Sequence, residues 1–173
     1  MKSIQALVVA IAAAAAGGSA WAHEEREQAF IASWAVGHIN PMAVNIVQYS
    51  NQTLREVVRA SAGGDQVRVR ISNSFGTDTL AIGEARIALS ASGSSIVPGT
   101  DRLLTFSGQR SINVPAGAPV LSDPVRLDLK ALSDLAVSIY LPNATAVETS
   151  TLFQGSSYVS LSSGNHAAAA RSS

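Results

Sequence analysis

From Phe30 onward, hydrophobic and polar residues alternate with a period of two, and turn-forming residues recur about every eight to twelve positions. This pattern is typical of an all-β sandwich or barrel, and we predict an antiparallel β-sandwich, jelly-roll-like, with about eight to ten strands. Only residues 24–32 could form a short helix, and they lack an apolar stripe. The expected strands cover residues 30–36, 53–61, 66–73, 80–90, 103–106, 111–114, 125–129, 135–141, 149–154 and 158–161.

The dipeptide Gly63-Gly64 predicts a tight hairpin between two of these strands, because glycine readily adopts the positive φ that two-residue turns require. In this hairpin, Val58 would pair with Val69 and Ala60 with Val67 on the side that faces the core. Replacing Gly64 by valine should then destabilise the fold, since a β-branched residue tolerates positive φ poorly.

The opposite face of the expected hairpin would carry four guanidinium groups, those of Arg55, Arg59, Arg68 and Arg70. Like charges on neighbouring strands are unfavourable unless acidic side chains or a partner compensate for them. This face is therefore either a solvated sheet surface with acidic partners, which would also discourage edge aggregation, or a docking surface. The four arginines are the candidate binding residues of the chain.

The N-terminus has the organisation of a secretory signal peptide. Lys2 is followed by an apolar run over residues 6–16 and by the A-x-A sequence Ala20-Trp21-Ala22. We expect residues 1–22 to be removed on export, 23–162 to form the β-sandwich domain, and 163–173 to be a polar C-terminal tail or truncated linker. The destination would be the periplasm or the medium. No later stretch approaches the roughly 20 apolar residues of a membrane span.

Composition narrows the possible functions. The chain has 12 basic and 12 acidic residues and no cysteine. This balance excludes a nucleic-acid binder held by bulk positive charge, and the lack of cysteine excludes a thiol nucleophile, a thiolate metal site and a disulfide scaffold. The core must therefore be stabilised by burial alone, which a domain of about 150 residues can achieve.

The sequence offers no catalytic or metal motif. The nucleophile pattern G-x-S-x-G does not occur, and Gly64-Asp65-Gln66 has glutamine where a Gly-Asp-Ser block would have serine. The three histidines, His23, His38 and His166, lie far apart and lack the spacing of metal ligands. We therefore assign no catalytic residue, no metal and no cofactor. The aromatic residues at strand positions are expected in the core, although exposed rings on one face could form a carbohydrate platform: Trp34, Phe75, Phe106, Tyr140 and Phe153.

Four segments resemble, in order and spacing, the N-terminal β-rich region of secreted bacterial SGNH/GDSL-type hydrolases, a family of esterases and lipases. They are QTLREVVRASAGGDQVRVRISNSFGTDTLAIGEARIALS (52–90), IVPGTDRLLTFSGQRSINVPAGAPVLSDPV (96–125), DLAVSIYLP (134–142) and residues 156–160. In that family this region precedes the catalytic domain. The chain contains neither the Gly-Asp-Ser block nor the Asp-x-x-His block, so no catalytic residue is carried over. The consecutive letters of Ser163-Gly164-Asn165-His166 are a coincidence.

Three functions remain open. The chain is the non-catalytic accessory sandwich of a truncated or split hydrolase, whose partner would be a catalytic SGNH domain. Alternatively, it is a free-standing exported module that binds a surface polysaccharide or another polymer through the arginines or an aromatic patch. A third alternative is a small esterase with an unrecognised site, in which His38 or His166 would have to act. Nucleic acid is not an expected partner.

Overall fold

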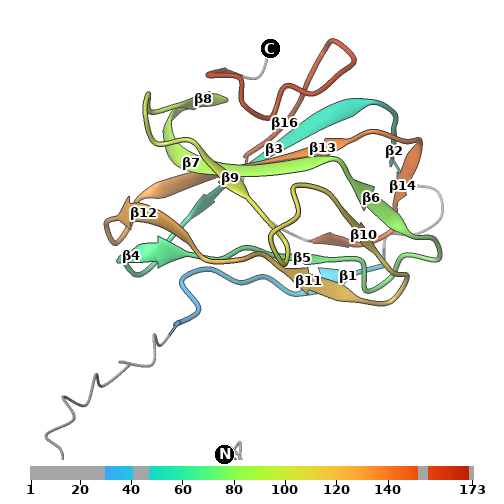
Figure 1. The fold of residues 1–173 in the computed structure, drawn as a ribbon, viewed down its shortest axis with the longest axis horizontal. Coiled ribbons are helices and arrows are strands. Elements are labelled where there is room, and N and C mark those ends of the chain that lie inside the picture. Colours follow the sequence, from blue (N-terminus) through green and yellow to red (C-terminus); the bar gives the residue numbers. More distant parts are fainter. Residues whose placement is uncertain (1–29, 41–46, 152–155, 172–173) are drawn as a thin grey trace, which may run out of the picture. The chain divides into compact units, whose positions relative to one another are not determined.

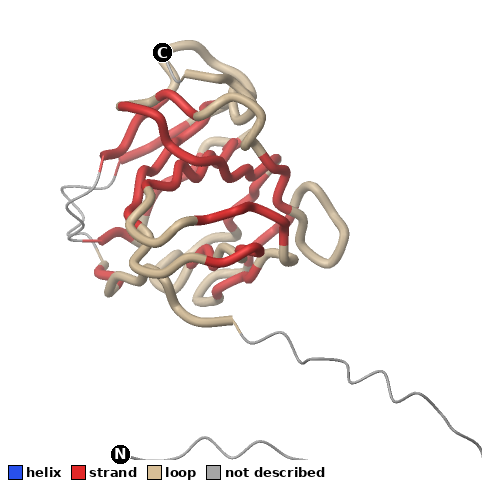
Figure 2. Tube along the Cα trace, turned by 90° about the vertical axis from the view of Figure 1, so that its left-hand side faces the viewer, coloured by secondary structure: helices blue, strands red, loops and turns tan. Residues whose placement is uncertain are grey.

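The computed structural model describes residues 30–40, 47–151 and 156–171. Phe30 and Ile31 belong to a separate N-terminal unit, and everything below concerns the unit that begins at Ala32. The described residues form strands and loops and contain no helix (Figure 2). The predicted all-β fold is therefore confirmed, whereas residues 24–29 of the possible short helix lie outside the described part.

A six-stranded antiparallel sheet forms one layer of this unit (Figure 1). Its central strand, β13, alternates large apolar residues with small ones, so that Leu135, Val137 and Ile139 face the core and Ala136 and Ser138 face the opposite side. The order along the sheet is β16 (Ser156–Val159), β3 (Gln52–Arg59), β13 (Asp134–Leu141), β7 (Glu84–Ser92) and β8 (Ser95–Ile96), and β9 (Arg102–Leu104) also pairs with β7.

Short antiparallel pairs form the remaining strands. They are β4 (Gly64–Val67) with β12 (Val125–Leu129), β5 (Arg70–Ser72) with β11 (Pro119–Leu121), β6 (Leu80–Ile82) with β10 (Ile112–Val114), β1 (His38–Ile39) with β15 (Ser150–Thr151), and β2 (Val47–Tyr49) with β14 (Thr145–Val147). The main core lies between the six-stranded sheet and the first three of these pairs. Buried Ile87 and Leu135 of the sheet, for example, share one cluster with Leu127 of β12 and Val114 of β10.

The predicted hairpin at Gly63-Gly64 is wrong. β3 pairs with β13 and β16, whereas β4 pairs with β12, so the chain crosses from one layer to the other between them. Neither glycine has a positive φ. A Cβ atom on Gly63 would lie 2.5 Å from the carbonyl oxygen of Leu129, and this close approach of two backbones explains why glycine is required there.

The side-chain alternation behind that prediction was nevertheless correct. Val58 and Ala60 are buried, and Val67 and Val69 pack against the same core cluster. They come from opposite layers of the sandwich and not from one hairpin. A period-two pattern reports which face a residue occupies, but it does not report which strand is the neighbour.

Several strand boundaries also differ from the prediction. The structure has more and shorter strands than expected, because long runs are interrupted. The run 66–73 breaks where the hydroxyl of buried Ser122 accepts a hydrogen bond from the N–H of Val69, and the run 80–90 breaks at Gly83. Residues 30–36 form no strand, and residues 152–154 lie outside the described part. Five short strands were not predicted: β1, β2, β8, β11 and β14.

Part of the outer face of the six-stranded sheet is covered by residues 160–171, which we call the C-terminal segment. Residues 163–173 were expected to be a polar tail or linker. In the described part of this stretch, residues 163–171, Gly164 donates to the carbonyl of Asn51, and Ile96 donates to the carbonyl of Ala170. Ala167 is only 1% exposed. In Figure 1 this red segment lies at the end of the unit that carries β8 and β16.

Candidate functional site

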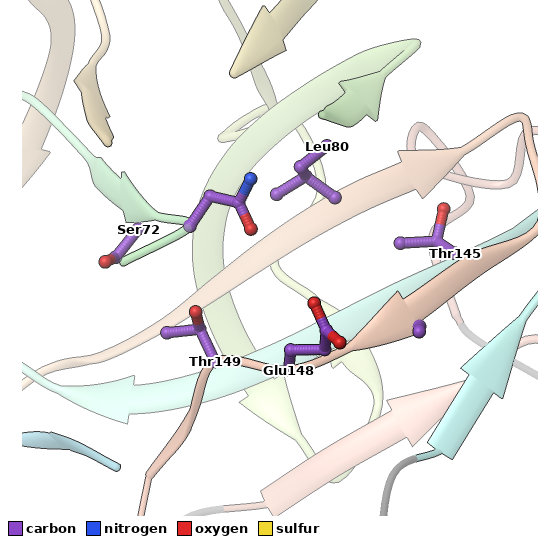
Figure 3. Close-up of a pocket in the computed structure, with 7 residues that line it drawn as sticks. Ser72, Leu80, Thr145, Glu148 and Thr149 are labelled. Carbon is purple, nitrogen blue, oxygen red and sulfur yellow. The ribbon is translucent and has the colours of Figure 1, made fainter. Parts of the chain in front are cut away.

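A polar groove lies between the loop that follows β5 and the segment around β14. It encloses about 160 Å³ and is lined by six polar residues, Asn73, Asp78, Thr79, Asn143, Thr145 and Glu148, together with apolar Leu80 and three alanines. A smaller adjoining hollow adds Ser72 and Thr149. Figure 3 shows that the Glu148 carboxylate in this hollow lies between Thr149 and Thr145.

Asn73 shapes one wall of this groove. Its side chain is buried, and its amide nitrogen donates to the carbonyl oxygens of Asp78, Val114 and Pro115. These bonds join the start and the end of the loop to the strand end at β10. A Cβ on Gly76 would lie 1.9 Å from the Asn73 side-chain oxygen, so the loop closes tightly over the asparagine. The wall is therefore fixed by the fold before any ligand binds.

Glu148 joins the two walls. One of its carboxylate oxygens, Oε2, accepts hydrogen bonds from the backbone N–H of Thr77 at 2.6 Å and from the Thr77 hydroxyl at 2.9 Å. These two hydrogen bonds, that from the backbone N–H first, hold the pKa of Glu148 below its ordinary value. The residue is therefore anionic at neutral pH. A second hydrogen bond joins the same two segments, because the N–H of Phe75 donates to the hydroxyl of Thr149.

The structure does not bring the four candidate arginines to one face. Arg55 points to the outer face of the six-stranded sheet, where it is only 1% exposed. Arg59 lies on the same face of β3, but it is exposed and forms an ion pair with Asp134. Arg68 and Arg70 belong to the other layer, where Arg68 donates to the Ser122 carbonyl. The predicted face shared by all four arginines is therefore wrong, because the hairpin that would have created it does not form. Binding by the exposed arginines stays a prediction.

Arg55 is a structural residue that anchors the C-terminal segment. Its guanidinium donates to the Ser138 hydroxyl at 2.8 Å and to the carbonyl oxygens of Ser94, Ala167 and Ala169. Burial lowers the pKa of Arg55, and the negative charge of Asp101 partly opposes this shift. Three carbonyl oxygens from two separate loops therefore depend on one buried cation.

A second network of charged side chains is centred on Glu84 of β7. Glu84 accepts hydrogen bonds from Arg86, Arg110 and the side-chain amide of Asn165, and Arg86 also pairs with Asp101. Burial alone would raise the pKa of Glu84, but the bonds from Arg110, Arg86 and Asn165 together outweigh it and leave the pKa below its ordinary value. The network stabilises the C-terminal segment through Asn165.

A serine and a histidine meet in the C-terminal segment. Ser162 Oγ lies 3.0 Å from His166 Nε2, and the same nitrogen lies 3.2 Å from the carbonyl oxygen of Ser163. A carbonyl can only accept a hydrogen bond, so this contact favours the tautomer in which Nε2 carries the proton. In that tautomer Nε2 donates and cannot accept the proton of Ser162 as a general base would. The other histidine considered for catalysis, His38, lies in β1, which pairs with β15.

The aromatic residues divide between core and surface. Phe106 is buried as predicted, and the Tyr140 hydroxyl donates to Asn51 on the outer face of the sheet. Trp34 and Phe75 were expected in the core, but they are 41% and 40% exposed. Phe75 belongs to the loop that forms one wall of the groove, whereas Phe153 lies outside the described residues.

The groove was not predicted from the sequence. Its residues belong to two polar stretches, 73–79 and 143–149, that read as ordinary turns. Their proximity depends on long-range pairing of short strands, for which the chain offers no local signal.

Within the described ranges, no three His, Asp or Glu side chains come together as a metal site would require, and no helix could span a membrane. Comparison of the chain with protein-family models and with curated proteins finds no significant match.

Proposed function

We propose that the chain is an exported, non-catalytic β-sandwich domain that accompanies an ester hydrolase of the SGNH/GDSL type. The observation that carries the proposal is that the segments on which the resemblance depends fold together. Residues 52–90, 96–125, 134–142 and 156–160 supply most of the six-stranded sheet and most of the three pairs that cover its core face. Strand β12 is the exception, because only its first residue, Val125, falls within them. Signal-peptide removal before His23 and a periplasmic or extracellular destination belong to the same proposal.

The docked C-terminal segment supports an accessory role. Main-chain carbonyls of this segment bind Arg55, and its Arg171 forms a β-bridge with Ser95. A catalytic domain joined beyond this segment would therefore be held at a defined place beside β8. Fixed attachment is what an accessory domain needs in order to orient its partner.

The test is reconstitution with a separately expressed SGNH-type catalytic domain. We expect the chain from His23 to bind that domain and to raise its stability or its turnover of a p-nitrophenyl ester. A matched variant that ends at Ser162 lacks residues 163–171 of the docked segment and should bind more weakly. Equal behaviour of the catalytic domain with and without the chain would overturn the proposal.

A second candidate function is a polymer-binding module, and the polar groove favours it. The groove brings several polar side chains together in one hollow, and convergent polar groups are what orient a ligand and give its binding specificity. Retention of the purified chain on an insoluble polysaccharide, and loss of this retention on Glu148→Gln, would support the module. Retention that is unchanged by the substitution would count against the groove as its site.

A further inference from the structure

We propose that the polar groove binds an amino sugar, with its ammonium group at the carboxylates and its hydroxyl groups at the neutral polar side chains. The carboxylates are those of Asp78 and Glu148. The hydrogen-bonding side chains around them are Thr79, Asn143 and Thr145. This inference rests on the second candidate function, the polymer-binding module, and adds the site and the class of ligand.

The charge of the groove selects the ligand class. Two of the lining side chains are acidic, and none is lysine or arginine. An anionic polymer such as a uronic acid chain would place like charges together, whereas a protonated amine would gain a charge-assisted hydrogen bond. A neutral sugar would bind the hydroxyl and amide groups but would leave the carboxylates without a cationic partner.

The carboxylate of Glu148 is oriented so that one of its oxygens can accept a hydrogen bond from a protonated amine. Its Oε2 atom is occupied by both donors of Thr77, which fixes the carboxylate in one orientation. Among the described residues no hydrogen bond reaches Oε1, so this oxygen can accept a donor from a ligand without breaking an internal contact. A carboxylate oriented in advance by the protein binds a cation at a lower entropic cost than a mobile one.

The shape and the rim of the groove fit a sugar ring. About 160 Å³ is room for several water molecules and hence for one ring-sized polar ligand. Leu80 lines the groove between the polar groups and offers an apolar contact. Phe75 belongs to the loop that forms one wall of the groove, and its N–H is bonded to Thr149, but its ring is not part of the lining of the groove.

The experiment compares three β-1,4-linked tetramers of equal length by titration calorimetry at mildly acidic pH and low salt. They are the tetramers of glucosamine, N-acetylglucosamine and glucose, of which only the first carries ammonium groups. We expect the glucosamine tetramer to bind about tenfold or more tightly than either neutral tetramer, because one charge-assisted hydrogen bond has about that effect. Binding should weaken with added salt.

Variants locate the site. Glu148→Gln keeps an acceptor for Thr77, and Asp78→Asn keeps the size of the side chain, so both should fold and lose about tenfold in affinity for the glucosamine tetramer. Asp128→Asn, at an exposed position of β12 outside the groove, is the matched control and should bind as the parent does. Amide chemical shifts of residues 73–81 and 143–149 should move on titration, a readout that does not depend on any variant folding.

Three outcomes would overturn the inference: equal binding of all three tetramers, unchanged binding by both groove variants, or no binding of any tetramer. The proposed accessory role is tested by association with a catalytic domain, without any sugar. A chain that associates but binds no tetramer would therefore refute this inference alone, and a chain that binds glucosamine but does not associate would refute only the accessory role.

Discussion

Arg55 is the residue on which the outer face of the sheet depends. A buried cation without a carboxylate in direct contact is unusual, because desolvation of its charge must be compensated by hydrogen bonds. Here the compensation comes from one hydroxyl and three main-chain carbonyls. Arg55 was predicted to belong to a binding surface, but its partners identify it as a structural anchor.

We predict that Arg55→Ala lowers the free energy of unfolding by about 3 kcal/mol or more, because it leaves several buried acceptors without a donor. Urea unfolding followed by fluorescence measures this quantity. Arg59→Ala is the matched control, since Arg59 is on the same face of the same strand but is exposed, and its ion pair with Asp134 is screened by solvent. Equal effects of the two substitutions would contradict the assigned role of Arg55.

The two neighbouring glycines give a second prediction at the scale of single residues. Gly63→Ala should destabilise the fold by about 1–3 kcal/mol, because its Cβ would collide with the Leu129 carbonyl oxygen and force the backbone to move. Gly64→Ala should change stability by less than about 1 kcal/mol, since the nearest atom to its Cβ is 3.8 Å away. The denaturation midpoints of the two variants distinguish these expectations. A larger loss of stability for Gly64→Ala than for Gly63→Ala would instead support a tight turn at Gly64.

At the scale of elements, the C-terminal segment lies against the sheet and is hydrogen-bonded to two of its strands. It contacts β3 through Thr53, whose hydroxyl donates to the carbonyl of Gly164 and accepts from the N–H of His166. It contacts β8 through the bond between Ile96 and Ala170. Ala167 of the same segment is buried.

Ending the chain at Ser162 should therefore destabilise the fold, and the effect should be coupled to Arg55. In the shortened chain Arg55 has already lost two of its acceptors, so Arg55→Met should cost less there than in the full chain. A double-mutant cycle should give a coupling energy of about 0.5–3 kcal/mol, as is usual for groups in direct contact. Strict additivity of the two changes would show that the segment and Arg55 stabilise the fold independently.

An element could be predicted from the sequence where the signal for it lies within the element itself. β12 and β13 were located nearly residue by residue because their alternation and their bounding turns lie within the strands themselves. The pairing partner of β3 was mispredicted because Gly63-Gly64 has the composition of a hairpin turn, whereas its glycines permit a close crossing over Leu129. The groove could not be predicted, since residues 73–79 and 143–149 meet only after the whole sandwich has formed.

The network around Glu84 connects these elements and predicts a dependence of stability on acid. A carboxylate whose pKa is lower in the folded state stabilises the fold above its unfolded pKa, and this contribution is lost as the pH falls through the folded pKa. The stability difference between the parent and Glu84→Gln should therefore shrink as the pH falls below the ordinary value of 4.5. Urea titrations at several pH values measure it, and a constant difference throughout the acid range would contradict the role of Glu84.

At the scale of the whole molecule, the two faces of the six-stranded sheet pack against different parts of the chain. One face forms the main core with the short strand pairs, and the other binds the chain's own C-terminal segment. The core face of the sheet is therefore closed to a ligand, and the outer face is partly covered by the chain itself. The polar groove lies instead where loops from the ends of β5 and β14 meet, which is where sandwich domains commonly carry their binding residues.

The proposed non-catalytic role makes a prediction for the entire chain: the purified protein from His23 will not turn over p-nitrophenyl esters. Acyl transfer needs a nucleophile, an oriented base and donors to the oxyanion in one place. Among the residues that the structure describes, Ser162 with His166 comes nearest to this arrangement, but Nε2 also contacts the Ser163 carbonyl. This contact favours the proton on the nitrogen that would have to accept one. Any trace of turnover should survive Ser162→Ala, His166→Ala and His38→Ala, since it would come from a contaminant. Turnover by the pure protein that disappears with one of these substitutions would instead identify a small esterase and refute the accessory role.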